Sequence, residues 1–104
     1  MAEDQTQIIE IANKFIELVK GRGIVVDSSY LFGSYANNNF DDWSDIDIAI
    51  VSESFEGNIL IDIEKILGLS RLVDTRISVL PLNNESLDSY FIQKEVIEKG
   101  IKIN

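Results

Sequence analysis

Residues 45–51, Asp-Ile-Asp-Ile-Ala-Ile-Val, constrain the fold of this chain more than any other segment. The segment is β-branched and aliphatic and carries aspartate at alternate positions, which predicts a strand whose two faces have different roles. One face then carries Asp45, Asp47 and Ala49, and the other carries Ile46, Ile48 and Ile50. The isoleucines can enter a core. The two carboxylates repel each other, which raises a pKa or destabilises the fold unless a positive charge lies between them.

The rest of the chain alternates predicted helices and strands. Residues 5–20 carry apolar side chains at helical spacing, which predicts an amphipathic helix that ends at Gly21 or Gly23. The further predicted elements are a short strand that ends at Gly33, a helix that begins at residue 58 and ends near Gly68, a strand over residues 72–80 closed by Pro81, a helix over residues 85–99 and a short edge strand over residues 101–104. This order predicts the α+β class, with a small mixed β-sheet flanked by helices that we expect on one side.

Length and residue types limit the chemistry that is available. With 104 residues the chain is expected to form a single domain, residues 1–104. It contains no cysteine and no histidine, which excludes disulfides, zinc-thiolate sites and the commonest general base. Catalysis would therefore depend on carboxylates, hydroxyls, Lys and Arg, or on a hard cation bound through oxygen. For the Asp45 and Asp47 pair, that cation would be magnesium or manganese.

The charge balance limits the partners. With 18 acidic and 9 basic residues, the chain has a formal net charge of -9. This argues against nucleic-acid binding, which depends on Lys and Arg that neutralise phosphates, whereas a nucleoside triphosphate brings its own magnesium. The first residues form neither a basic n-region nor an apolar h-region, and no apolar run approaches membrane-spanning length. We therefore expect no membrane association and a cytoplasmic protein.

Gly33 and Ser34 lie where the first predicted strand ends and a short helical turn, residues 34–38, begins. Such a turn presents backbone N–H groups and the positive end of its dipole. Glycine lets a phosphate approach the backbone closely, and the serine hydroxyl can donate to a phosphate oxygen. The alternative is structural, with Gly33 making a turn and Ser34 capping a helix.

Gly33 and Ser34, a ten-residue connection over residues 35–44, and then Asp45 and Asp47 form a longer pattern. This pattern resembles the signature of the nucleotidyltransferase superfamily that includes DNA polymerase β, and specifically its smallest branch, the minimal nucleotidyltransferases of the antitoxin type. The likeness covers nearly the whole chain. It implies a core like the palm of polymerase β and an enzyme that transfers a nucleoside monophosphate.

The resemblance also implies roles for particular residues. Gly33 and Ser34 would bind the triphosphate, and Asp45 and Asp47 would bind two Mg²⁺ ions, or Mn²⁺. A third carboxylate would complete the site as a metal ligand or as the base for the acceptor hydroxyl, and it falls on Asp74 in the predicted strand over residues 72–80.

The assignment of Asp74 has alternatives. Asp74 could instead form a salt bridge with Arg71 or Arg76, and Arg76 could contact a phosphate. Some relatives carry an acidic residue near the position of Ser78, which is a second candidate position for the third ligand.

The middle of the pattern departs from the relatives, which often carry Arg or Lys shortly after the Gly-Ser pair. This chain has Asn37, Asn38 and Asn39 there, followed by Asp41 and Asp42. Asparagine can donate a hydrogen bond to phosphate but supplies no charge, so triphosphate affinity is in question. We interpret Asp41 and Asp42 as part of a solvated loop. Phe40 and Trp43 are interpreted as loop anchors, while Tyr35 could be an anchor or could stack on a base.

Small members of this family typically act with a helical partner of the HEPN type. The resemblance therefore implies transfer of AMP from ATP to a tyrosine of a partner protein, as in toxin-antitoxin pairs. Two other functions stay open. One is a module that neutralises a partner by contact, without catalysis, and the other is nucleotidylation of a small molecule.

Overall fold

The computed structural model describes residues 5–37, 44–64, 66 and 68–103. Its centre is a four-stranded sheet with the strand order β3-β2-β1-β4. The strands are β1 (Ser28–Phe32), β2 (Ile46–Val51), β3 (Ile77–Leu82) and β4 (Ile101–Lys102). β1 is antiparallel to β2 and β4, whereas β2 is parallel to β3. The predicted mixed sheet and the predicted C-terminal edge strand are thus confirmed.

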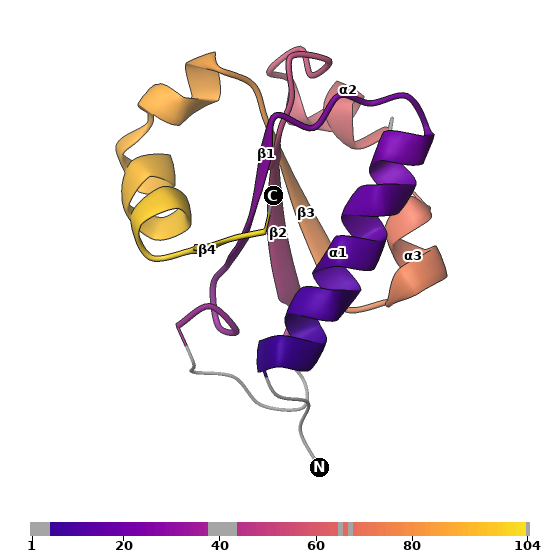
Figure 1. The fold of residues 1–104 in the computed structure, drawn as a ribbon. Helices are drawn as coiled ribbons and strands as arrows, with labels where there is room; N and C mark the ends of the chain where they lie inside the picture. Colours follow the sequence, from indigo (N-terminus) through magenta and orange to yellow (C-terminus); the bar gives the residue numbers. More distant parts are fainter. Residues whose placement is uncertain (1–4, 38–43, 65, 67, 104) are drawn as a thin grey trace.

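One face of the sheet is covered by three helices, α1 (Gln5–Gly21), α2 (Ile59–Glu64) and α3 (Leu69–Val73) (Figure 1). α1 matches the predicted amphipathic helix, and its residues Ile8, Ala12, Phe15, Ile16 and Val19 are buried. They pack against Ile46, Ile48 and Ile50 of β2, whose side chains are all 0% exposed. The alternation of β2 therefore sends its isoleucines into the core, as predicted.

The opposite face is also covered, so the prediction of helices on one side only is wrong. A short 3₁₀ helix, η1 (Glu85–Asp88), and a π-helix, η2 (Ile92–Glu98), lie there (Figure 1). Ile92 and Val96 of η2 pack against Ala49 and Val51 of β2 in a second, smaller cluster. Each face of β2 thus has its own apolar layer. Asp45 and Asp47 lie at the start of β2, on the face that η2 covers.

Two predicted helices differ in the structure. The helix predicted from residue 58 to near Gly68 forms only α2, which ends at Glu64, and a second helix, α3, begins at Leu69. Gly68 precedes α3 with a φ of 90°, which a continuous helix does not allow. The C-terminal helix is divided, since Ser89 has an extended conformation with ψ of 133° between η1 and η2.

The third strand also begins and ends later than predicted. Residues 72 and 73 belong to α3, and β3 begins at Ile77. Pro81 does not close the strand but pairs with Ile50 inside it. β3 is an edge strand, and a proline is tolerated at an edge because its missing N–H removes no hydrogen bond from the interior of the sheet.

Among the described helices, none combines the length and the apolar character that crossing a bilayer requires.

Candidate active site

The register of the sheet places the Gly-Ser turn beside the aspartate pair. Phe32, the last residue of β1, is paired with Asp47 of β2. Gly33 therefore begins its turn next to the Asp47 side chain. Its φ is 75°, and a Cβ added there would collide with the Asp47 carboxylate. Glycine is needed at position 33 both for its backbone conformation and for this close approach.

Residues 33–37 form a hydrogen-bonded turn, in which the N–H of Asn37 donates to the Gly33 carbonyl at 3.1 Å. Ser34 lies in the first part of this turn, where backbone N–H groups have no partner within the turn. The predicted turn is confirmed up to Asn37. The remaining residues of interest in the loop lie outside the described residues, namely Asn38, Asn39, Phe40, Asp41, Asp42 and Trp43.

The carboxylates of Asp45 and Asp47 differ in their surroundings. Asp45 is exposed, whereas Asp47 is half-buried between its neighbours on β1 and β3. Burial raises the pKa of the Asp47 carboxyl, and the negative charge of Asp45 raises it further. The pair thus carries the repulsion that strand alternation predicts. A divalent cation would relieve it, and the all-oxygen donor set fits magnesium or manganese.

Asp74 is not on a strand, which corrects the sequence-based placement. It follows the last residue of α3, and its carboxylate is held by Arg76. Oδ1 accepts from the backbone N–H and the Nε of Arg76 at 2.9 and 3.0 Å, and Oδ2 accepts from Nη2 at 2.8 Å. These hydrogen bonds, led by those of the side chain, lower the pKa of Asp74. The alternative of a salt bridge with Arg76 is therefore confirmed.

The described residues contain no group of three or more acidic side chains that could hold a metal ion together. Asp45 and Asp47 form a pair, and in this conformation Asp74 does not join them. Its role as the third ligand stays a prediction.

Tyr35 connects the turn with the core. Its side chain is 1% exposed, so it is an anchor rather than a surface on which a base could stack. Its hydroxyl accepts a hydrogen bond from Nη1 of Arg76 at 3.3 Å, and its carbonyl accepts from Nε2 of Gln5 at 2.8 Å. Neither contact could be predicted from a local pattern, because both join residues at least 30 positions apart.

Ser78 lies directly across from Asp47 in the parallel β2–β3 ladder. Paired residues of neighbouring strands point to the same face of a sheet, so the exposed Ser78 shares the face of the carboxylate pair. Its position is the one that a third ligand carried by β3 would occupy.

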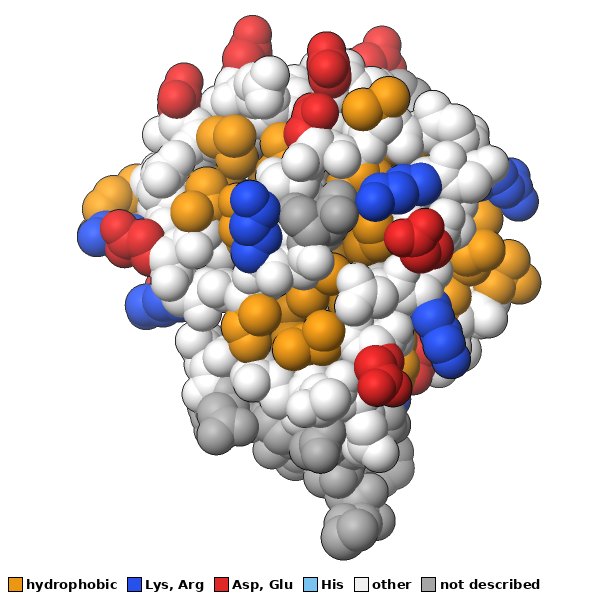
Figure 2. Space-filling view, viewed as in Figure 1, with side chains coloured by type: hydrophobic (Ala, Val, Ile, Leu, Met, Phe, Trp, Pro, Cys, Tyr) orange, Lys and Arg blue, Asp and Glu red, His pale blue; other side chains and the backbone are white. Residues whose placement is uncertain are grey.

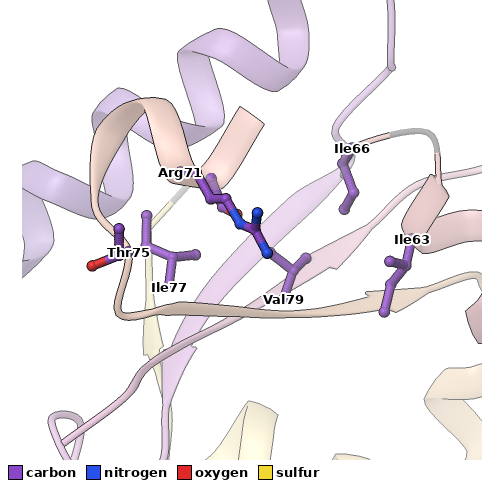
Figure 3. A pocket seen from close by; sticks show the side chains of 7 residues that line it. Ile63, Ile66, Arg71, Thr75, Ile77 and Val79 are labelled. Carbon is purple, nitrogen blue, oxygen red and sulfur yellow. The ribbon is translucent and has the colours of Figure 1, made fainter. Parts of the chain in front are cut away.

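A pocket of about 250 Å³ lies elsewhere, between α2, α3 and β3 (Figure 3). The described residues that line it are Ile63, Ile66, Ser70, Arg71, Thr75, Ile77 and Val79. Figure 3 shows the guanidinium of Arg71 directed over β3 toward Val79. Arg71, the other predicted salt-bridge partner of Asp74, thus lines this pocket, and none of the predicted site residues is among the lining residues.

The comparison with known families supports the same assignment. The sequence profile of the nucleotidyltransferase domain family matches residues 8–103. The chain therefore belongs to this family, which confirms the resemblance seen in its sequence. A search of curated proteins found no match.

Two solved structures share the fold. A candidate nucleotidyltransferase from Sulfolobus solfataricus superimposes with a TM-score of 0.67 at 21% identity, over 94% of this chain and 80% of that one. A chain from a mutant MntA-HpeT toxin-antitoxin structure gives a TM-score of 0.65 at 22% identity, over 88% of this chain and 71% of that one. At such identities the likeness concerns the fold, which is that of a nucleotidyltransferase.

Proposed function

We propose that this nucleotidyltransferase transfers AMP from ATP to a hydroxyl group of a partner protein, with a two-metal in-line mechanism. The observation that carries the proposal is the contact between Gly33 and the Asp47 carboxylate. It places a turn suited to phosphate directly beside an acidic pair suited to a cation. A magnesium-bound triphosphate would need backbone N–H groups for its phosphates beside carboxylates for its cation.

Different residues of the candidate site have different roles in the proposed reaction. Gly33 allows the triphosphate to approach the backbone, and Ser34 donates its hydroxyl to a phosphate oxygen. Asp45 and Asp47 hold Mg²⁺, or Mn²⁺, from the neighbouring strand. Bound there, the cations would neutralise charge on the phosphates and lower the pKa of the acceptor hydroxyl. The third ligand predicted at Asp74 stays a prediction, and the contacts with Arg76 favour a different role.

Exposed apolar side chains support a protein partner. Among the described residues, the large apolar side chains with the greatest exposure are Val25, Leu60, Leu72, Tyr90 and Phe91, which are 56%, 79%, 72%, 77% and 55% exposed. Figure 2 shows apolar side chains gathered in several patches on one side of the molecule, with charged side chains between them. Exposed apolar patches often mark protein contacts. The neighbour from the MntA-HpeT structure belongs to a toxin-antitoxin pair, which supports a protein partner. That this partner is a helical protein of the HEPN type is part of the proposal.

The test is to incubate the purified protein with Mg²⁺, ATP and a cell extract, and to search by mass spectrometry for proteins that gain an AMP unit. We expect such a protein, and we expect the Asp45→Ala and Asp47→Ala double variant to leave it unmodified. Asp88→Asn removes an exposed carboxylate of η1 and serves as the matched control. If no protein gains mass and ATP binding does not depend on metal, the proposal is wrong.

The absence of a third acidic side chain beside Asp45 and Asp47 in the described residues favours one alternative. In it the chain is a binding module that neutralises a partner by contact. The double variant separates the two functions. It should abolish both modification and neutralisation if the chain is an enzyme, and leave neutralisation intact if contact alone suffices.

A further inference from the structure

The contacts of Asp74 identify a role that the sequence did not indicate. Arg76 occupies both of its carboxylate oxygens through three hydrogen bonds. The two side chains are only 16% and 25% exposed. Charge-assisted hydrogen bonds of this fork geometry are among the stronger ones in proteins. A carboxylate bound in this way is already neutralised by its own arginine, so it attracts a cation less than the unpaired carboxylates of the site do.

Arg76 extends from Asp74 to both halves of the candidate site. Its Nη1 donates to the hydroxyl of Tyr35, two residues after Gly33, at 3.3 Å. Its carbonyl accepts from the N–H of Ile46, the residue between the two aspartates, at 2.9 Å. One residue thus contacts the phosphate-binding turn and the strand that carries the acidic pair.

The turn is also held from the other side. Gln5 of α1 donates to the Tyr35 carbonyl at 2.8 Å, while the Tyr35 ring is buried in the core. Because Gly33 already contacts the Asp47 carboxylate, a small shift of the turn changes the space between them. Misplacement of a substrate-binding group by 1 Å can lower activity by about a hundredfold.

From these contacts we infer that Asp74 is a positioning residue: through Arg76 and Tyr35 it fixes the Gly33–Ser34 turn against the Asp45–Asp47 pair. It does not ligate the metal. This inference rests on the proposed function, since it concerns the same site. The position across from Asp47 that a third ligand would occupy belongs to Ser78, which gives the test a matched variant.

The test compares Mn²⁺ binding, followed by electron paramagnetic resonance, with binding of a non-hydrolysable ATP analogue, followed by calorimetry. Asp74→Asn and Arg76→Gln should each weaken analogue binding by about tenfold, the range typical of residues that orient ligating groups. Both should leave the affinity for Mn²⁺ alone within about twofold. Ser78→Asp should strengthen Mn²⁺ binding, and Asp47→Asn should abolish it.

A double variant shows whether Asp74 acts through Arg76 or independently of it, because the effects of the two substitutions on analogue binding add only if the residues act independently. If Asp74 acts through Arg76, the Asp74→Asn and Arg76→Gln double variant binds the analogue no more weakly than the poorer single variant. Tyr35→Phe should weaken binding less, because it removes one hydrogen bond and keeps the ring in the core. The inference is overturned if Asp74→Asn loses Mn²⁺ binding as Asp47→Asn does, or if the two single effects add.

A measurement without ligand separates this inference from the proposed function. In the metal-free protein, Asp74→Asn and Arg76→Gln should shift the NMR amide signals of Gly33 and Ser34. Ile50→Val removes a methylene from the core at a position paired with Ser29, near the opposite end of β1 from the turn. It is the matched destabilised control and should leave these signals in place. If wild-type protein binds neither Mn²⁺ nor the analogue, the proposed function fails, while the amide shifts still decide the positioning role. Unshifted amides would overturn it.

Discussion

Asp47 and Asp74 lie near the starts of two neighbouring parallel strands, in opposite electrostatic surroundings. Asp47 is half-buried beside Asp45, and burial and repulsion raise its pKa. Asp74 accepts three hydrogen bonds from Arg76, and its pKa is lowered. A carboxylate that lies beside another negative charge is a candidate cation ligand, whereas a carboxylate neutralised by an arginine is a candidate structural residue. The comparison therefore assigns Asp47 to the proposed chemistry and Asp74 to the support of the proposed site.

The largest expected effect comes from removing the Asp47 charge. Asp47→Asn should lower AMP transfer by at least about a hundredfold, because even residues that only orient metal ligands account for 10- to 100-fold. Transfer rates measured with radiolabelled ATP test this. A variant that keeps activity within tenfold of the wild type would show that Asp47 is not a metal ligand. The proposed difference in role between Asp47 and Asp74 would then be wrong.

Asp74→Asn should instead destabilise the protein, by about 1 to 3 kcal/mol, because it breaks charge-assisted hydrogen bonds in a mostly buried pair. The folded pKa of Asp74 lies below its ordinary value of 3.8, so the contribution is complete above that value. It is lost as the pH falls through the folded pKa. The difference from wild type in the free energy of unfolding should therefore be constant near pH 7 and shrink below about pH 4.

Urea unfolding at several pH values measures this difference. Glu98→Gln is the matched control, since it breaks an exposed ion pair with Lys94 in which both side chains are 45% or more exposed. It should cost less than about 1 kcal/mol. Equal losses for the two variants would contradict the framework role of Asp74.

Gly33→Ala tests the close approach between the Gly33–Ser34 turn and the Asp47 carboxylate. It forces alanine to a φ of 75° and places a Cβ against the Asp47 carboxylate. We expect a loss of about 1 kcal/mol or more in stability, together with weaker triphosphate binding. Gly21→Ala is the control, because the space around Gly21 is open and its φ is not positive. An unchanged thermal midpoint and unchanged ATP binding in Gly33→Ala would disprove the close approach.

The smallest effect is a gain in stability. Because the folded pKa of Asp47 is raised above its ordinary value, ionised Asp47 destabilises the fold at neutral pH. Asp47→Asn should thus raise the free energy of unfolding by about 0.5 to 1 kcal/mol at pH 7, which is in the range common for stabilising substitutions. The gain should disappear as the pH falls below 3.8, where the carboxyl is protonated in both states. Thermal unfolding from pH 3 to 8 measures it, and a loss at pH 7 would contradict it.

Local patterns in the sequence were sufficient where the interactions are local. The period of α1 and the alternation of β2 predicted which side chains enter the core, and the predicted pairing of Asp45 with Asp47 follows from two residues of one strand. The boundaries failed between residues 58 and 80, where short apolar runs are compatible with a helix or a strand. The stop near Gly68 was predicted and agrees with its positive φ, whereas the helix α3 that follows it and the start of β3 at Ile77, which pairs with Ile46, were not predicted.

The sequence by itself determined the family, the core face of β2 and the candidate residues at which we propose phosphate and metal binding, because these depend on residue type and short spacing. Only the tertiary structure decided that Gly33 meets Asp47, that Asp74 pairs with Arg76 and that Ser78 faces the acidic pair. Strand register and contacts between distant residues are set by the packing of the whole chain. They leave no periodic signal in any one segment.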